Sequence, residues 1–223
     1  MRTFKIRKDP YDDRKIYNKT IFKINPGVTI LVGCNGSGKT TLLRYIEDQI
    51  KALNRKIEDK SLRIPVFKYN NYTQGGNFAL QRALDTNNMD LLAASAFASE
   101  GERILTNFGQ TIKGLGSFVT KHKDTKEMWI LFDAVESGLS IDNIREIKGF
   151  FKFLLNEQKQ KELYILVSTN SYEFCIDEPC FDVQNAKYID INSYEDYANF
   201  VMKSREYKDK SYDELEEDKD EEE

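Results

Sequence analysis

One stretch of the chain decides its fold: Val28-Thr-Ile-Leu-Val-Gly-Cys-Asn-Gly-Ser-Gly-Lys39-Thr40. Residues 28–33 form a short apolar run that ends in a glycine, which is typical of a strand buried on both faces. Residues 39–56 carry apolar side chains at helical spacing, which predicts an amphipathic helix. A buried strand, a glycine-rich loop and a helix therefore follow one another directly, and this order indicates an α/β fold.

The glycine-rich loop, Gly33-Cys-Asn-Gly-Ser-Gly-Lys39-Thr40, matches the Walker A pattern. Glycines let the backbone curl until successive N–H groups point at phosphate oxygens, and the helix N-terminus adds positive partial charge. We expect the Lys39 ammonium to reach the outer phosphates and the Thr40 hydroxyl to bind Mg²⁺. The predicted nucleotide-binding residues here are Asn35, Gly36, Ser37, Gly38, Lys39, Thr40 and Thr41. The sequence therefore predicts a nucleoside triphosphate site, for ATP with Mg²⁺.

A second motif, Met128-Trp-Ile-Leu-Phe-Asp133, is an apolar strand that ends in a carboxylate. The carboxyl ends of parallel strands lie at one edge of a sheet, so Asp133 should lie beside the glycine-rich loop and hold Mg²⁺ directly or through water. Many core strands also end in an aspartate that only caps a helix. The first motif makes the metal-binding interpretation the preferred one.

Further apolar runs predict strands at residues 63–69 and 163–168, and helical spacing recurs at residues 89–98, 100–122, 141–159 and 194–205. Short buried strands separated by helices indicate a mostly parallel sheet with helices on both faces. Residues 3–6 and 19–24 predict a small antiparallel portion at the N-terminus. The 223 residues, 40% of them hydrophobic, suffice for one core.

The charge is distributed unevenly along the chain. Residues 208–223 contain ten acidic and three basic residues, which leaves residues 1–207 with a net charge of +3. Such an acidic run favours a disordered tail after a single domain over residues 1–207. The alternative is a tail that competes with nucleic acid for a basic face or docks on a partner.

Cysteine usage and hydropathy suggest the cell compartment. Three cysteines, Cys34, Cys175 and Cys180, and the single histidine His122 predict neither a disulfide framework nor a Cys/His metal site. Cys34 lies inside the glycine-rich loop, either as a small tolerated residue or as a redox switch. No run of 18 apolar residues and no signal-like N-terminus occurs. We therefore expect a cytoplasmic protein without membrane insertion.

The fuller string Gly33-Cys-Asn-Gly-Ser-Gly-Lys-Thr-Thr-Leu-Leu43 resembles the ABC-type ATPases, especially the soluble branch with SMC-like, RecF-like and OLD-type proteins. Ser99-Glu-Gly-Glu-Arg103 resembles the signature motif of that class, although the bare string is also an ordinary helix N-cap. The resemblance covers about residues 19–175. It implies a P-loop NTPase sheet with a helical signature lobe. It also implies a homodimer in which Ser99, Gly101 and Glu102 bind the ATP of the opposite subunit.

Two positions depart from that family. Asp133-Ala-Val-Glu-Ser-Gly-Leu-Ser140 resembles its Walker B end and D-loop, but Ala134 replaces the glutamate that acts as general base. Asn170 replaces the histidine of the switch segment, and an asparagine cannot be protonated. The resemblance implies catalytic roles for Asp133, Glu136 and Asn170, with Glu136 orienting water. Its place three residues beyond Asp133 favours the alternatives, in which Glu136 starts the next turn or pairs across the dimer. We predict a slow ATPase, since removing a positioned base costs ~10²–10⁴ in rate.

Two further assignments are less specific. Gln74 resembles the Q-loop residue of the family, which implies contacts to the nucleotide and to Mg²⁺; a plain polar loop residue is the alternative. Tyr11 or Tyr17 are candidates to stack on adenine, but a chain with 12 tyrosines is expected to have one near its N-terminus in any case.

Three classes of function remain open. The leading one is an ATP-gated dimeric switch or clamp for a partner protein. The second is a DNA-associated repair or recombination ATPase, which the mildly basic body allows. The third is the nucleotide-binding subunit of a transporter, which Ala134 disfavours. A small-molecule kinase is weaker still, because the signature-like and D-loop-like strings would then have no purpose.

Overall fold

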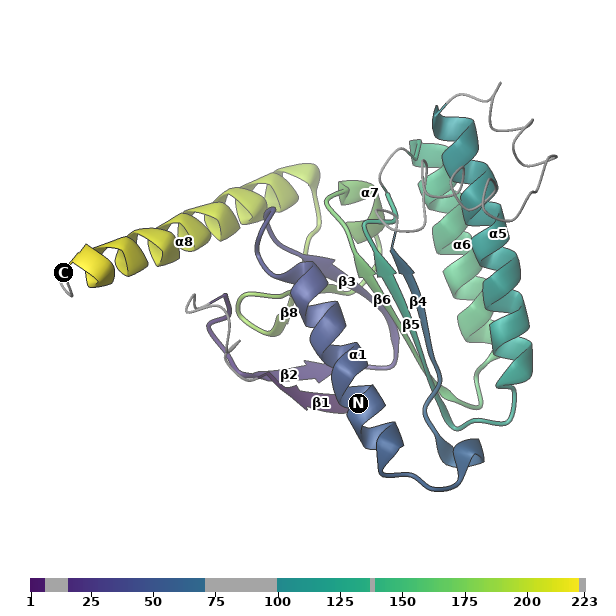
Figure 1. Cartoon of the computed structure of the whole chain (residues 1–223). Coiled ribbons are helices and arrows are strands. Elements are labelled where there is room, and N and C mark those ends of the chain that lie inside the picture. The colour runs from purple at the N-terminus through teal and green to yellow at the C-terminus, as the bar shows by residue number, and fades with distance from the viewer. Residues whose placement is uncertain (7–15, 71–99, 137–138, 221–223) are drawn as a thin grey trace.

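The computed structural model describes residues 1–6, 16–70, 100–136 and 139–220 (Figure 1). The strands are β1 (Arg2–Lys5), β2 (Ile21–Ile24), β3 (Gly27–Val32), β4 (Val66–Asn70), β5 (Glu127–Asp133), β6 (Glu162–Ser168), β7 (Cys180–Asp182) and β8 (Lys187–Ile189). The helices are α1 (Lys39–Arg55), η1 (Lys60–Leu62), α5 (Glu100–Lys121), α6 (Ile141–Glu157), α7 (Tyr172–Cys175) and α8 (Tyr194–Asp220).

A six-stranded sheet forms the centre of the molecule, in the order β4-β5-β6-β3-β7-β8. All neighbouring strands are parallel except β7 and β8. The register aligns Asn70 with Asp133, Asp133 with Ser168, and Ser168 with Leu31. The carboxyl ends of four strands therefore lie in one row, so the segments that follow them begin at the same edge of the sheet.

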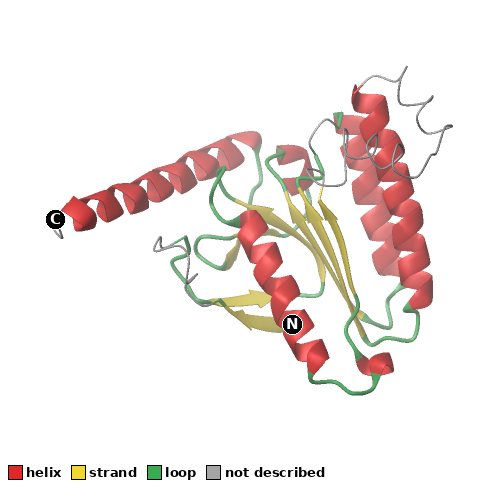
Figure 2. Ribbon diagram, in the orientation of Figure 1, coloured by secondary structure: helices red, strands yellow, loops and turns green. Residues whose placement is uncertain are grey.

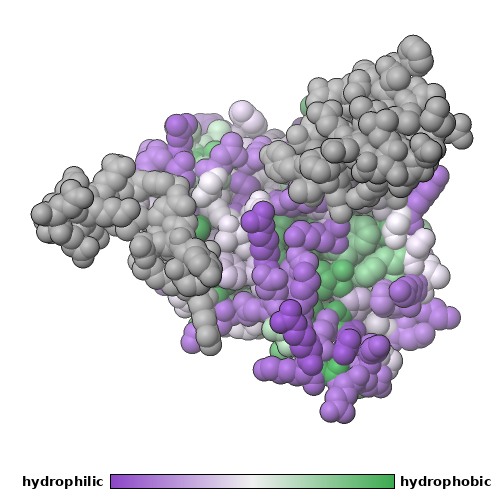
Figure 3. All heavy atoms as spheres, in the orientation of Figure 1, coloured by the Kyte–Doolittle hydropathy of each residue, from purple (hydrophilic) through white to green (hydrophobic). Residues whose placement is uncertain are grey.

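Helices cover both faces of this sheet, with α1 on one face and α5 and α6 on the other (Figure 2). Successive strand residues point to opposite faces. Leu131 accordingly packs in the core cluster that contains Leu42 of α1. Phe132 packs in the cluster that contains Phe151 of α6, with ring centroids 5.1 Å apart. The outward face of α1 is hydrophilic, as an amphipathic helix requires (Figure 3). The α/β class, the mostly parallel sheet and its helical layers are confirmed.

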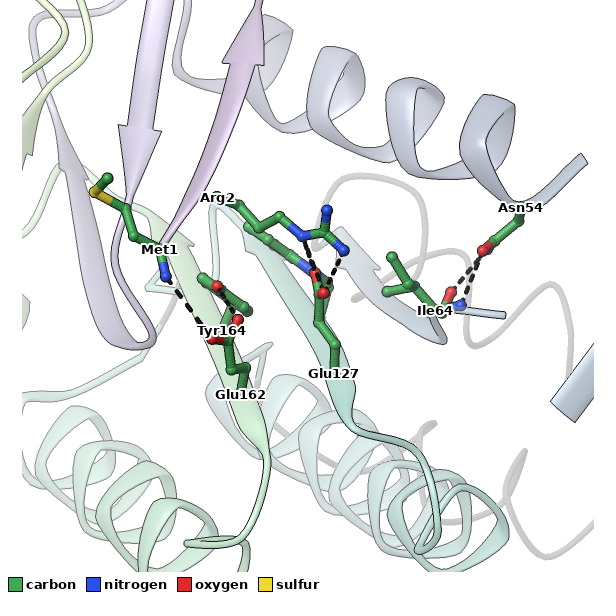
Figure 4. Close-up of polar contacts among 8 residues, drawn as sticks. Met1, Arg2, Asn54, Ile64, Glu127, Glu162 and Tyr164 are labelled. Carbon is green, nitrogen blue, oxygen red and sulfur yellow. Dashed lines mark hydrogen bonds and ion pairs between the residues drawn. The ribbon is translucent and has the colours of Figure 1, made fainter. Parts of the chain in front are cut away.

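The expected N-terminal portion is a two-stranded antiparallel sheet of β1 and β2. It packs on the α1 side of the main sheet, where Phe4 contacts Trp129 edge to face at a centroid separation of 5.3 Å. Arg2 donates from Nε to both carboxylate oxygens of Glu127, at 2.8 and 2.9 Å (Figure 4). This prediction is also confirmed.

The predicted strands need two corrections, one to a boundary and one for strands that were missed. The strand predicted at residues 63–69 begins only at Val66. Before this strand, the backbone N–H and C=O of Ile64 each form a 2.8 Å hydrogen bond with the side-chain amide of Asn54 (Figure 4). The next residue, Pro65, has no N–H to donate. β7 and β8 were not predicted, because each has only three residues. The predicted helix at residues 89–98 lies outside the described residues.

The last helix is much longer than predicted. α8 continues through Asp220, whereas the sequence favoured a helix over residues 194–205 and a disordered acidic tail from residue 208. Glu, Lys and Arg are good helix formers, and Arg205 lies 3.7 Å from the Asp209 carboxylate one turn later. Figure 1 shows α8 crossing the carboxyl end of the sheet and running outward to the C-terminus. None of the described helices is long and apolar enough to cross a membrane.

Candidate nucleotide-binding site

The glycine-rich loop, residues 33–40, links the carboxyl end of β3 to α1. Its backbone adopts left-handed angles at Gly36 and Gly38, with φ of 80° and 94°. A Cβ on Gly38 would lie 2.5 Å from Ile16 Cγ2 and 2.8 Å from the Tyr17 ring. A Cβ on Gly33 would lie 2.3 Å from Ser37 Oγ. The curled shape therefore favours glycine at Gly36 for conformational reasons, and at Gly33 and Gly38 for steric reasons as well.

Lys39 begins α1 and folds back into the loop. Its side chain is only 8% exposed, and Nζ donates to the carbonyl oxygens of Gly33 at 2.7 Å and Cys34 at 3.0 Å. Burial lowers the pKa of this ammonium below its ordinary value of 10.5, and nearby carboxylates oppose the shift. The loop thus encloses one positive charge that has little contact with solvent.

Asp133 lies directly beside this loop. It is 2% exposed, and the Thr40 hydroxyl donates to its Oδ1 at 2.9 Å. Asn70, at the end of β4, donates from Nδ2 to its Oδ2 at 2.8 Å. A hydroxyl and a carboxylate oxygen thus converge at the edge of the sheet, and hard oxygen donors of this kind suit Mg²⁺. No cluster of three His, Cys, Asp or Glu side chains suited to a metal occurs among the described residues.

The segment after Asp133 has an unusual backbone. Ala134 adopts φ of 54°, which is uncommon for a residue with a Cβ, and its N–H donates to Ser168 O at 3.1 Å. Glu136 then points toward the end of β6, where its Oε1 accepts the N–H of Asn170 at 2.7 Å. Its Oε2 is buried and has no hydrogen-bond partner among the residues that the structure describes. A carboxylate is therefore held at the same edge as Asp133.

Two residues from distant segments contact the loop from outside. The Tyr17 hydroxyl donates to Gly38 O at 2.7 Å, and its ring lies edge to face on Phe22 at 5.1 Å. Ser204 of α8 accepts the Cys34 N–H at 2.9 Å. Burial raises the pKa of Tyr17, so its hydroxyl remains a hydrogen-bond donor. The loop is braced at both of its ends.

The predicted residues are only partly brought together. Lys39, Thr40 and Asp133 converge, with Glu136 and the Asn170 backbone beside them. Asn35 and Gly36 are exposed, Thr41 is half-buried, and Ser37 Oγ is buried without a partner among the described residues. Gln74, Ser99 and Tyr11 lie outside the described residues. Gly101 and Glu102 lie in the first turn of α5, for which only the backbone is described.

Three residues were missed by the sequence analysis: Asn70, Gln184 and Ser204. Asn70 follows an apolar run in the same way as Asp133 does, so the end of a strand was an available signal. Gln184 and Ser204 belong to no recognisable pattern. Comparison with models of known protein families found no match, and a search of curated proteins found no relative. The geometry of the site therefore carries the functional conclusion.

Proposed function

We propose that this chain is an ATP-binding ABC-type ATPase of the P-loop class. In this proposal it turns over slowly and works as an ATP-gated dimeric switch or clamp for a partner protein. The observation that carries the proposal is the contact of Thr40 with Asp133 beside the enclosed Lys39 ammonium. Anion-binding backbone, a buried cation and a hydroxyl–carboxylate pair at one strand edge together suit a polyphosphate with a divalent cation.

ATP binds in this proposal with its phosphates in the glycine-rich loop. Loop amides and the N-terminus of α1 supply hydrogen bonds and positive partial charge. Lys39 Nζ replaces its hydrogen bond to a loop carbonyl by one to a phosphate oxygen. The buried ammonium thereby gains a partner of opposite charge. Thr40 and Asp133 would hold Mg²⁺, which neutralises phosphate charge when bound. Asn70 orients the Asp133 carboxylate through the hydrogen bond to Oδ2.

Hydrolysis is slow because the residue after Asp133 has no base. Ala134 has no side-chain lone pair, so water next to the γ-phosphate lacks the usual proton acceptor. Glu136 is the substitute that the geometry favours. One of its carboxylate oxygens accepts the Asn170 N–H. The other has no hydrogen-bond partner among the described residues and is the oxygen that would accept a proton from water. Asn170 contributes its backbone here and can contribute its amide to the γ-phosphate.

The dimer rests on the resemblance to the ABC class. Two copies face head to tail, and each presents Ser99, Gly101 and Glu102 to the ATP of the other. ATP then stabilises the closed dimer because it binds that state better than the open one. A partner protein binds the closed and the open dimer with different affinity.

The test is equilibrium binding of labelled ATP with Mg²⁺ to the wild type, Lys39→Ala and Lys51→Ala. Lys51 is a matched control, because it lies on the same helix and forms a surface ion pair with Glu47 at 2.6 Å. Losing a charged hydrogen bond to phosphate costs ~2 kcal/mol or more, so Lys39→Ala should bind at least about 30-fold more weakly. Lys51→Ala should bind as the wild type does.

Sedimentation of the same samples tests the clamp. ATP should convert the wild type and Lys51→Ala to dimers and leave Lys39→Ala monomeric. Equal ATP affinity of Lys39→Ala and the wild type would overturn the whole proposal. A wild type that binds ATP and stays monomeric would overturn the dimeric clamp and leave the nucleotide site standing.

A further inference from the structure

The glycine-rich loop makes one buried contact that phosphate binding does not explain. The N–H of Cys34 donates to Ser204 Oγ at 2.9 Å, across 170 positions of sequence. Ser204 is 4% exposed and lies on α8, the helix that crosses the carboxyl end of the sheet (Figure 1). This loop amide is therefore engaged by α8, just as the Ser37 N–H is engaged within the loop by Cys34 O at 3.2 Å.

The hydrogen bonds around Ser204 can be arranged in only one direction. A backbone N–H can only donate, so Ser204 Oγ accepts from Cys34 and must send its own proton elsewhere. That proton goes to Gln184 Oε1 at 2.6 Å, and Gln184 Nε2 donates in return to Ser204 O at 3.2 Å. Gln184 is 3% exposed, and Asp182 Oδ1 accepts its N–H at 3.0 Å. The loop is thus linked through α8 to the end of β7.

α8 contacts the site at two further places. One turn beyond Ser204, the stem of Lys208 lies beside the exposed Gly36, whose added Cβ would lie 3.5 Å from Lys208 Cδ. One to two turns before Ser204, the Tyr197 ring packs on Tyr172 at a centroid separation of 5.8 Å. Tyr172 opens α7, directly after the Asn170 segment. One helix therefore touches both segments that face the proposed nucleotide.

We propose that α8 is coupled to nucleotide occupancy and that Ser204 is the positioning residue that makes the coupling. Ser204 holds the Cys34 amide outward and so stabilises the loop conformation that accepts phosphates. By reciprocity, a nucleotide that stabilises this loop conformation also stabilises the docking of α8. This inference rests on the proposed function and adds the element that transmits the nucleotide state away from the site.

The first arm of the test compares Ser204→Ala, Ser204→Thr and Lys203→Ala in labelled-ATP binding. Ser204→Ala removes the hydrogen bonds of Ser204 Oγ to Cys34 and to Gln184, and the loss of the one to the loop should weaken ATP binding about fivefold. Ser204→Thr keeps the hydroxyl and should recover most of the affinity. Lys203 is exposed and precedes Ser204 on the same helix, so its variant should bind ATP as the wild type does. Unchanged affinity in Ser204→Ala would overturn the inference.

The second arm needs no change at Ser204 and reports on α8 directly. Amide hydrogen exchange is measured over residues 197–208 of the full-length chain, with and without ATP and Mg²⁺, in the wild type and in Lys39→Ala. ATP should slow exchange on α8 by about tenfold in the wild type and leave Lys39→Ala unchanged. Unchanged exchange on α8 in a wild type that demonstrably binds ATP would overturn the inference alone. A wild type that does not bind ATP would overturn the proposed function itself.

Discussion

The glycine-rich loop and the segment after Asp133 meet at the same edge of the sheet, and their charged side chains are satisfied to different degrees. In the loop, Lys39 donates to two carbonyl oxygens and the Thr40 hydroxyl has a carboxylate partner at 2.9 Å. Across the edge, Ala134 has a left-handed backbone with φ of 54°, and Glu136 keeps one buried oxygen unpartnered among the described residues.

This difference separates binding from hydrolysis in the proposed function. The loop backbone is already curled, so we expect polyphosphate binding to require an exchange of the Lys39 hydrogen-bond partners and no refolding of the loop. The left-handed Ala134 and the unpartnered Glu136 oxygen mark a segment that we expect to change conformation. If the proposed function is correct, the molecule is therefore better prepared to hold ATP than to cleave it. Substitutions on the two sides should separate these properties, and each prediction below tests one side against the other.

The largest effect is expected at Ala134, on the hydrolysis side. Ala134→Glu restores a carboxylate in the position that follows Asp133. Because a positioned base contributes ~10²–10⁴ in rate, single-turnover ATP hydrolysis should rise by about this factor. ATP affinity should stay close to that of the wild type, since the loop is unchanged. Ala134 already has a Cβ at positive φ, so a glutamate there requires no backbone conformation that the alanine does not already adopt.

Ala134→Gln is the matched control for this prediction. It has the size of glutamate and cannot accept a proton, so its single-turnover rate should remain at the wild-type level. A wild-type chain that hydrolyses ATP as fast as Ala134→Glu would show that the segment after Asp133 already supplies a working general base. The contrast between the two sides of the site would then be wrong.

The next largest effect is expected in the glycine-rich loop. Gly38→Ala places a Cβ at φ of 94° and within 2.5 Å of Ile16 Cγ2. Left-handed backbone and overpacking together should lower the free energy of unfolding by ~2–4 kcal/mol, measured by urea denaturation. Gly114→Ala in α5 is the control, because its Cβ would meet nothing within 4 Å in the part of the chain that the structure describes. That variant should gain about 0.5–1 kcal/mol through better helix propensity. Equal stability of the two variants would show that the loop is not held in its curled form.

Local order was predictable from the sequence because it depends on spacing over few residues. The run before Gly33 and the helical spacing after Lys39 predicted β3 and α1 closely. The row at the carboxyl edge followed from parallel pairing, and the structure indeed places Asp133 in contact with Thr40. Periodicity carries such information whether or not the rest of the chain is known.

Contacts between distant segments were not predictable in this way. Ser204 and Cys34 are 170 positions apart, and nothing in the sequence near a single serine on a polar helix indicates a buried bond to a loop amide. The left-handed backbone of Ala134 was equally unpredictable, since alanine rarely adopts that conformation and its hydrogen bond to Ser168 O joins segments 34 positions apart. β7 and β8 were missed because three residues are too few to show alternation.

The smallest effect is expected for Glu136→Gln, which distinguishes a side chain that orients water from one that pairs across the dimer. Glutamine keeps an oxygen to accept the Asn170 N–H and loses the charge, so the local backbone should be retained. If Glu136 orients water, single-turnover hydrolysis should fall about tenfold, less than the ~10²–10⁴ of a lost general base because the glutamine amide still hydrogen-bonds water, with unchanged ATP-dependent dimerisation in sedimentation. If it pairs across the dimer instead, dimerisation should weaken and the rate should fall only as far as the dimer is lost. Glu146→Gln, on the exposed face of α6, is the charge-matched control and should change neither quantity. Because the geometry directs Glu136 to the Asn170 backbone of its own chain, we expect the first pattern.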